Sequence, residues 1–515
     1  MREQAASHSE DNHPSTPPKS FPFTVVQPHK LKRPSLIASM QWVLLSNVIC
    51  RPIQLVCHIL LARVLGPAAF GIMGLANTAS VSLAGIAGFG LDCSASKFVA
   101  ESHRHDPAEA ARLGAMLLWS SAITSTFFFM LLAMGQGYWV ARFFPTGISS
   151  HIIHLSLIMG WLQVIVTVWL NILTGLQQFK ELSLMNILQS IVISILALVL
   201  GAYAGTHGAI TGYLIGNLLV LGLGAYFLAQ YSRSYFQWPK GWNRATLFPI
   251  LSYSLGGWVS YFITGPANTY VLALLARQPD GSLQLGLFNT ANAIKMLIGV
   301  LPGLITPVIS AAFLDEGGKH GDPKAYEKLF LQSFHALLFL ILPLLVLLLF
   351  WSPTIFLAYG KAYQGASILY IPLVASIVAG MFCSPAQFAL AAKGKMWWIL
   401  LLGGLDSLVL VLCARAWITP YLSQGLAWSF VVAQFIMSLC MHESGIRFHA
   451  IAPSSRRSYY FGMIISGLLV LIAWTFPVKI QYILALPLSV LIGGYLLYRH
   501  PKTAEAVVRA LKIRK

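Results

Sequence analysis

The first long apolar segment of the chain, near residues 36–62, carries four polar side chains. They are Asn47, Arg51, Gln54 and His58, and their spacings of four, three and four residues place them on one face of an α-helix. An arginine inside hydrocarbon is costly, so such a face normally turns to the protein interior or to water. Arg51 could bind a phosphate through two parallel N–H groups, or pair with a carbonyl or an aspartate to fix helix packing. The pattern favours the first role, in the wall of a cavity.

A second polar face is predicted in the seventh apolar segment, near residues 247–275. It contains Trp258, Tyr261 and Asn268, a combination of two aromatic rings and an amide. Sugars present apolar ring faces and hydroxyl edges, which aromatic and amide side chains can bind. Hydrogen bonds between neighbouring helices would explain the same residues equally well.

Two further charged side chains, Lys295 and Asp406, lie inside apolar segments. Together with Arg51 they leave a net positive interior, which suits an anionic substrate. Asp406 is the only carboxylate well inside such a segment, so it either pairs with one of the two cations or takes part in ion coupling. His58 is either a proton-responsive group or a hydrogen-bonding residue of the helix packing.

The composition indicates a membrane protein. Of the 515 residues, 57% are hydrophobic and 10% are charged, against about 25% charged residues in soluble domains, and the mean hydropathy is +0.71. The net charge of +18 is spread between apolar runs, which argues against nucleic acid and favours anionic membrane lipids as partners. The six cysteines form no metal-ligand pattern, and we expect no disulfide, no metal and no cofactor.

About fourteen apolar segments are long enough to cross a bilayer as helices. An even number places both termini on one side of the membrane. Most of the 34 Lys and Arg residues flank the segments on that side, which predicts cytoplasmic termini. The predicted parts are a disordered cytoplasmic tail at 1–35, an N-lobe of six helices at 36–230, a C-lobe of six helices at 247–441, two further helices at 459–498 and a basic cytoplasmic tail at 499–515.

The two predicted lobes carry an internal repeat. The tetrapeptide Leu-Leu-Ala-Arg begins eight residues after Pro52 and again eight residues after Pro266. Further on, Gly71 and Gly286 begin similar segments that end in Ala-Asn. The repeats start six crossings apart, so they share an orientation and predict a pseudo-two-fold axis along the membrane normal. Prolines at matching positions of two halves free backbone carbonyls and often mark the central site of a transporter.

Short segments of the chain resemble the landmarks of one family, in the family's order. They are Leu61-Ala62-Arg63-Val64-Leu65-Gly66-Pro67-Ala68-Ala69-Phe70-Gly71, Gly90-Leu91-Asp92 with Lys97-Phe98-Val99-Ala100-Glu101, Gly175-Leu176-Gln177-Gln178-Phe179-Lys180 and Tyr359-Gly360-Lys361-Ala362-Tyr363. On these residues the chain resembles the polysaccharide-transport (Wzx-type) flippases of the multidrug/oligosaccharidyl-lipid/polysaccharide exporter superfamily. One departure is Asn268, where many members carry an acid, which puts acid-based coupling at that position in doubt.

The resemblance implies an all-α polytopic membrane protein of about fourteen helices, with two six-helix lobes around a central cavity and two C-terminal helices. It also implies a flippase of the bacterial inner membrane. Such a protein moves an undecaprenyl-diphosphate-linked oligosaccharide to the periplasmic leaflet for O-antigen, capsule or exopolysaccharide assembly, by alternating access. In this hypothesis Arg51 and Lys295 hold the diphosphate while amides and aromatic rings contact the sugars. Polymerase and glycosyltransferases of the same pathway would be partners.

Two other functions of the superfamily stay open, a cation-coupled small-molecule exporter and a lipid II flippase. No carboxylate lies inside the first six segments, where such exporters usually couple ions. Arg51 is the only arginine inside the first two segments, whereas lipid II flippases typically carry several there. A membrane glycosyltransferase or polymerase would need a sizeable outer loop with catalytic residues. The outer loops of this chain are short and almost free of acids, so we do not expect an enzyme.

Overall fold

The computed structural model describes most of the chain. Its described ranges are 36–143, 149–231, 244–299, 323–451, 453–475 and 487–491. Within these ranges the chain is almost entirely α-helical and contains no β-strand, which confirms the predicted all-α class. Both predicted tails and most of the predicted last helix lie outside the described residues.

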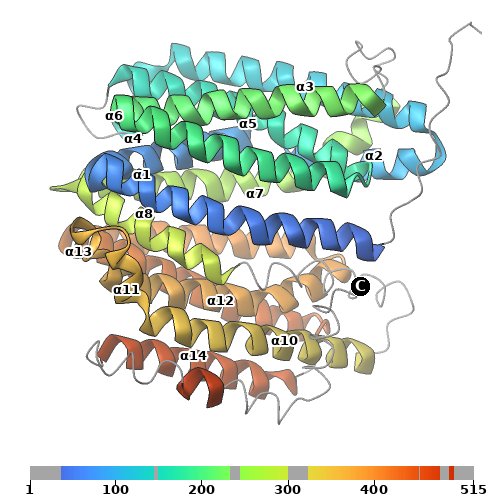
Figure 1. The fold of residues 1–515 in the computed structure, drawn as a ribbon. Helices are drawn as coiled ribbons and strands as arrows, with labels where there is room; N and C mark the ends of the chain where they lie inside the picture. Colours follow the sequence, from blue (N-terminus) through green and yellow to red (C-terminus); the bar gives the residue numbers. More distant parts are fainter. Residues whose placement is uncertain are drawn as a thin grey trace, which may run out of the picture.

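Nine of the described helices are long and apolar enough to cross a membrane. They are α1 (Leu36–Ala87), α3 (Pro107–Met134), α5 (Ser150–Gly175), α6 (Phe179–Tyr231), α7 (Arg244–Ala276), α10 (Pro323–Phe350), α12 (Ala366–Ala392), α13 (Met396–Arg447) and α14 (Ser455–Thr475). The helix α8 (Gly281–Ile298) begins the predicted eighth crossing. Figure 1 shows these helices running along one common direction, as a membrane bundle requires.

Three of the long helices are each long enough for two crossings. The helices α1, α6 and α13 have 52, 53 and 52 residues. A straight helix of that length would measure about 78 Å, although about 30 Å crosses the hydrocarbon. Each one breaks at a residue with non-helical backbone, at Gly66 in α1, at Gly205 in α6 and at Leu422 in α13. Gly66 has a φ of 74°, a left-handed conformation that glycine adopts without strain. These breaks fall where the sequence predicts short loops between crossings.

Short helices occupy several connections that the sequence predicts as loops. They are α2 (Leu91–His105), α4 (Gln136–Phe143), α11 (Ser352–Leu357) and the 3₁₀ turn η2 (Lys361–Tyr363). Capping explains the boundary between α2 and α3, because the Asp106 carboxylate accepts a hydrogen bond from the Ala108 N–H at 2.8 Å. Pro107 follows at the first helical position, where its missing N–H is not needed.

The second half of α1 and α8 cross at a pair of glycines. A Cβ atom on Gly71 would collide with the backbone of Ser282 and Gly286, and a Cβ atom on Gly286 would collide with the backbone of Pro67. The repeat aligns Gly71 with Gly286. It also aligns Pro67 with Ser282, so the contact is reciprocal, as at a two-fold interface. Small residues let membrane helices approach this closely, and the crossing lies where the predicted pseudo-two-fold relation requires one.

Figure 1 places α2–α6 on one side of the bundle and α10–α14 on the other, with α1, α7 and α8 between them. We refer to α1–α6 as the first half and to α7–α14 as the second half; the exact lobe boundaries remain a prediction. Rings fill much of the second half, where Phe334 packs against Phe382 and Tyr459 with centroids 5.3 and 6.0 Å apart. The interior of the first half is instead partly open and polar.

The glycine crossing leads to a stability prediction. Gly71→Ala should destabilise the protein, because the added methyl group meets backbone atoms, and overpacking costs about 1–3 kcal/mol. Gly222→Ala is the matched control, since nothing lies within 4 Å of a Cβ atom at that position of α6. We expect a lower melting temperature only for Gly71→Ala, measured by size-exclusion chromatography of the detergent-solubilised protein after heating. Equal melting temperatures for the two variants would contradict the close crossing.

Candidate functional site

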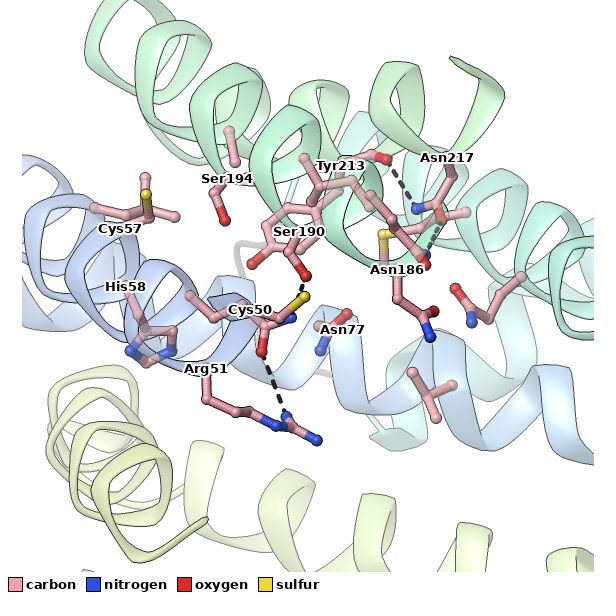
Figure 2. Close-up of a pocket in the computed structure, with 18 of the residues that line it drawn as sticks. Cys50, Arg51, Cys57, His58, Asn77, Asn186, Ser190, Ser194, Tyr213 and Asn217 are labelled. Atoms are coloured by element: carbon pink, nitrogen blue, oxygen red, sulfur yellow. Dashed lines mark hydrogen bonds between the residues drawn. The ribbon is translucent and has the colours of Figure 1, made fainter. Parts of the chain in front are cut away.

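The first half contains a polar pocket with a volume of about 500 Å³. Its walls come from both halves of α1, from α5 and from both halves of α6. This volume lies in the range of about 300–1,000 Å³ that small-molecule sites occupy. Figure 2 shows Asn77, Asn186, Ser190 and Asn217 around a common space, with Arg51 at one edge.

The polar face predicted in the first crossing forms one wall of this pocket. All four of its residues, Asn47, Arg51, Gln54 and His58, line the space. Arg51 Nη1 donates a hydrogen bond to Gln54 Oε1 at 3.4 Å, and Gln54 Nε2 donates to Ser190 Oγ at 2.9 Å. A chain of polar contacts therefore runs from the guanidinium across to α6, as the dashed lines in Figure 2 show.

Sequence reasoning missed most of the other amides in the wall. They are Asn77, Gln163, Asn186, Gln189 and Asn217. A signal for some of them exists, because Asn186, Gln189, Ser190 and Ser194 recur on one face of α6. The same spacing of three or four residues predicted the polar face of the first crossing, but this part of α6 contains no charged residue.

Neighbouring groups hold part of the pocket in place. Asn217 Nδ2 donates to the Tyr213 carbonyl at 2.9 Å, and Gln189 Nε2 donates to Asn217 Oδ1 at 3.5 Å. Arg51 is the only permanently charged residue in the described lining, which contains no acid and no lysine. The described lining of the pocket therefore offers neutral hydrogen-bond donors and acceptors, with one positive charge at the edge.

The polar face predicted in the seventh crossing lies elsewhere in this conformation. Trp258 Nε1 donates to the Ile86 carbonyl of α1 at 2.9 Å. Tyr261 OH donates to Asp92 Oδ2 of α2 at 3.4 Å. Asn268 Nδ2 donates to a carbonyl of its own helix at 3.1 Å. None of the three lines the pocket; Trp258 and Tyr261 join the two halves, and a role for the three in substrate binding stays a prediction.

The other two charged residues, Lys295 and Asp406, do not line the pocket either. Lys295 is only 8% exposed, and its Nζ lies 5.5 Å from the ring centroid of Phe430. Gln434 Nε2 donates to both carboxylate oxygens of Asp406, at 3.0 and 3.1 Å. Among the residues that the structure describes, Asp406 forms no ion pair with a lysine or arginine. An amide rather than a cation therefore faces this carboxylate.

A second contact between the halves lies beside the break of α1, and we call it the latch. The latch consists of His58, Ala62, Arg63 and Phe70 from α1 and of Ala358, Tyr359 and Tyr363 from the segment that connects α11 to α12. Arg63 Nε donates to the Ala358 carbonyl at 2.7 Å, and Tyr363 OH donates to the Ala62 carbonyl at 2.7 Å. Two of the landmark segments of the sequence thus meet in space.

His58 belongs to both the pocket and the latch. It lines the pocket, and its ring meets Phe70 edge-on with centroids 4.7 Å apart. His58 Nδ1 also lies 3.4 Å from Tyr359 OH. Because Phe70 and Tyr359 are buried, a displacement of this imidazole would disturb the packing of the latch.

The fold is similar to those of several solved transporters. The lipid II flippase MurJ, in an inward closed conformation, gives a TM-score of 0.62 at 16% identity, over 91% of this chain and 99% of that chain. An inward-facing multidrug resistance transporter of the MATE family, in the MOP superfamily, gives 0.61 at 15% identity over 83% and 98%. A MOP superfamily transporter from Pyrococcus furiosus gives 0.58 at 16% identity over 84% and 96%. At these identities the likeness shows the fold alone.

The helical bundle and these neighbours define the class of the protein, a multi-pass α-helical membrane protein whose fold is similar to those of solved MOP superfamily transporters. Residues 36–314, more than half of the chain, match the model of the polysaccharide biosynthesis protein family, and the chain belongs to that family. No curated protein sequence matches the chain. The family membership predicted from the landmark segments is thereby confirmed.

The latch leads to an accessibility prediction. Tyr363→Phe removes the hydroxyl that donates to the buried Ala62 carbonyl, and loss of this hydrogen bond should weaken the closed latch by about 1 kcal/mol, or about fivefold. We expect faster maleimide labelling of a cysteine at position 62, in a background without the native cysteines. Tyr421→Phe is the control, because Tyr421 is exposed at the break of α13. Labelling that is equally slow in both variants would show that this hydrogen bond does not hold the latch closed.

Proposed function

We propose that the chain is a flippase of the bacterial inner membrane. It moves an undecaprenyl-diphosphate-linked oligosaccharide from the cytoplasmic to the periplasmic leaflet by alternating access. The pocket carries this proposal, because its described lining combines amides and hydroxyls with apolar groups, two thiols and the His58 imidazole, with Arg51 at the edge and no acid. Such a lining is complementary to sugar hydroxyls beside a phosphate anion. The family, described as polysaccharide biosynthesis proteins, supports the same substrate class.

Arg51 is the group that we assign to the diphosphate. Its side chain is exposed, and its contact with Gln54 at 3.4 Å uses only one of its five N–H donors. A fixed charge at this depth is stable only beside water, a partner or an anion, so an anionic ligand would stabilise it. Lys295, the second proposed cation, is buried in this conformation and would reach the diphosphate only after the two halves move.

Alternating access requires the latch to open. With cytoplasmic termini, the break of α1 at Gly66 and the latch beside it would face the periplasm. The conformation described here would then admit a head group from the cytoplasmic side. The lipid tail would remain in hydrocarbon throughout, so that only the polar head group needs a path through the protein. His58 would connect the occupied pocket to the latch, since it contacts both.

We assign the coupling of transport to a cation gradient to Asp406. Among the described residues a neutral amide faces this carboxylate, so no described cation would compensate its charge when it is ionised. Binding of a proton or a metal cation would neutralise it. A ligand can shift a conformational equilibrium only through different affinities for the two states, so the bound cation would have to favour one of them.

A cation-coupled small-molecule exporter is the first alternative, because a multidrug resistance transporter is among the fold neighbours. The arginine and the absence of acids in the described lining would disfavour an organic cation in this pocket. A lipid II flippase is the second alternative, and MurJ is a fold neighbour. Its substrate is also a lipid-linked sugar diphosphate, so a comparison of head groups has to separate the two functions.

The proposed substrate implies which enzymes would act before and after this protein. Glycosyltransferases on the cytoplasmic face would supply the lipid-linked unit, and a polymerase on the periplasmic face would consume it for O-antigen, capsule or exopolysaccharide. The Lys and Arg residues between the apolar segments support cytoplasmic termini. They also suit contact with anionic lipids of the cytoplasmic leaflet.

The assigned role of Arg51 is tested by transfer of a labelled undecaprenyl-diphosphate oligosaccharide between the leaflets of proteoliposomes. Arg51→Ala should lower the rate about tenfold or more, because a hydrogen bond to a charged group is worth about 1.5–3 kcal/mol. Arg447→Ala, at the exposed end of α13, should transfer lipid as fast as the wild type. Both variants should reach the same abundance in membranes. Unchanged transfer by Arg51→Ala would remove Arg51 from the site.

The assigned role of Asp406 is tested by the dependence of transfer on an imposed proton or sodium gradient. Asp406→Asn keeps the shape and one oxygen acceptor for Gln434 but removes the charge that would bind the cation. We expect this variant to transfer lipid at a rate that no longer responds to the gradient. Glu443→Gln is the control, because that carboxylate is already paired with Arg456 at 2.6 Å. A gradient response that survives in Asp406→Asn would leave Asp406 with a structural role.

A further inference from the structure

We propose that Arg63 and Lys361, on the exposed side of the latch, form a second anion site. This outer site would bind the diphosphate of the lipid after its head group has crossed the membrane. The inference rests on the flippase function proposed above and on the cytoplasmic termini, which would direct the latch toward the periplasm. It gives the transported diphosphate a cation at each end of its path, with Arg51 in the pocket and the outer site at the exit.

The guanidinium of Arg63 is held in place by one hydrogen bond and has further donors that are unused. Its Nε donates to the Ala358 carbonyl at 2.7 Å, although the side chain is exposed. The two Nη groups carry four more N–H donors, and no residue within the described part of the chain accepts a hydrogen bond from them. A fixed guanidinium with two free nitrogen atoms can bind a phosphate through parallel hydrogen bonds.

Lys361 lies in a short segment whose two ends are bonded to neighbouring residues of α1. The first anchor is the Ala358 carbonyl, which accepts the hydrogen bond from Arg63. The second anchor is Tyr363 OH, which donates to the Ala62 carbonyl at 2.7 Å. Lys361 lies between these anchors and is the exposed first residue of η2. The two contacts therefore keep the lysine beside the guanidinium.

The segments that form the outer site carry two permanent positive charges and no acid. Neither α1 nor the segment 351–375 contains an aspartate or a glutamate. Among the residues that the structure describes, no carboxylate pairs with Arg63 or Lys361. A diphosphate carries negative charge on both phosphates, so the guanidinium can bind one of them and the ammonium the other. A phospholipid phosphodiester has one charge and would use only one of the two cations.

The outer site lies at the distance from the pocket that an exit site requires. Arg51 and Arg63 are twelve residues apart on the first arm of α1. A helix rises 1.5 Å per residue, which places them about 18 Å apart along the axis, more than half of the roughly 30 Å of hydrocarbon. One cation therefore cannot serve both ends of the path. The outer site would stabilise the diphosphate where it leaves the protein.

Protection of Lys361 from chemical labelling tests the outer site directly. The purified full-length chain in phosphatidylcholine nanodiscs is acetylated with a water-soluble ester, and each modified lysine is quantified by mass spectrometry. Pyrophosphate at about ten times its Kd should slow the labelling of Lys361 about tenfold by mass action. Lys395, an exposed lysine directly before α13, should be labelled at an unchanged rate. Labelling of Lys361 that pyrophosphate does not slow would overturn the outer site.

Variants separate anion binding by Arg63 from its contact in the latch. Arg63→Ala should raise the pyrophosphate concentration for half-protection of Lys361 about tenfold, because a charged, two-pronged contact is lost. Tyr363→Phe loosens the latch but removes no charge, so that concentration should not change. Arg415→Gln, which removes an exposed cation of α13 outside the latch, should not change it either. If Tyr363→Phe raises the concentration as much as Arg63→Ala does, the assignment of Arg63 as a ligand is overturned.

Lipids in the nanodisc identify the source of the anion. Undecaprenyl diphosphate added to phosphatidylcholine should protect Lys361, as free pyrophosphate does. Phosphatidylglycerol at the same mole fraction should protect it much less, because its head group has one charge. Equal protection by phosphatidylglycerol would overturn the preference for a diphosphate. Protection by free pyrophosphate but not by undecaprenyl diphosphate would overturn the lipid head group as the ligand.

Transfer of the lipid-linked oligosaccharide between leaflets separates this inference from the flippase function. Lys361→Gln removes one charge but neither hydrogen bond of the latch, and it should slow transfer about fivefold to tenfold. If the wild type transfers no lipid while pyrophosphate protects Lys361, the flippase function is overturned and the anion site stands. If the wild type transfers lipid and Lys361→Gln transfers it equally fast, the exit role is overturned and the flippase function stands.

Discussion

Hydrocarbon offers no partner for a hydrogen bond, and this constraint decides where the polar side chains of the chain can lie. In the first half they face inward, where amides from three helices surround a common space. In the second half rings and aliphatic groups fill much of the described interior. Lys295 is buried beside Phe430, and the half-buried Asp406 accepts hydrogen bonds from Gln434. The two halves share the sequence repeat and a helical architecture, but the first half encloses a polar pocket and the second half a packed apolar interior. The polar pocket of the first half follows from this difference.

The break at Gly66 divides α1 into two arms, and both arms line the pocket and contact the other half. The second arm packs against the other half from the glycine crossing at Gly71 to Ile86, whose carbonyl accepts a hydrogen bond from Trp258. The first arm carries Arg51 and Gln54, and both side chains are exposed. The left-handed conformation of Gly66 joins the two arms, with the latch beside it. A movement of the two halves relative to each other would therefore change the packing of the second arm. Because the two arms are joined, it would also displace the first arm, which carries Arg51 and Gln54.

Helical periodicity predicted the wall of the site because it acts within one helix. Asn47, Arg51, Gln54 and His58 share a face whatever surrounds them, and the structure puts all four on the pocket. The same reasoning placed Trp258 and Tyr261 on one face but could not say which neighbour that face meets. Here it meets α1 and α2. Helical periodicity could also have placed Asn186 and Gln189 on one face, but their segment contains no charged residue that would single out this face. The latch depends on contacts between residues about 300 positions apart, which spacing alone cannot predict.

One polar pair shows how the halves have diverged. In the first half Gln189 on one arm of α6 bonds to Asn217 on the other arm, and in the second half Gln434 bonds to Asp406 across the two arms of α13. Both pairs join residues 28 positions apart across the break of a helix that supplies two crossings. The geometry is thus common, but one pair is neutral and the other holds a carboxylate. The neutral pair adds no charge to the described lining of the pocket, whereas the carboxylate of the second pair is the group to which we assign the cation response. The separation of head-group recognition from cation response that we propose therefore needs only one amide-to-acid difference between two equivalent positions.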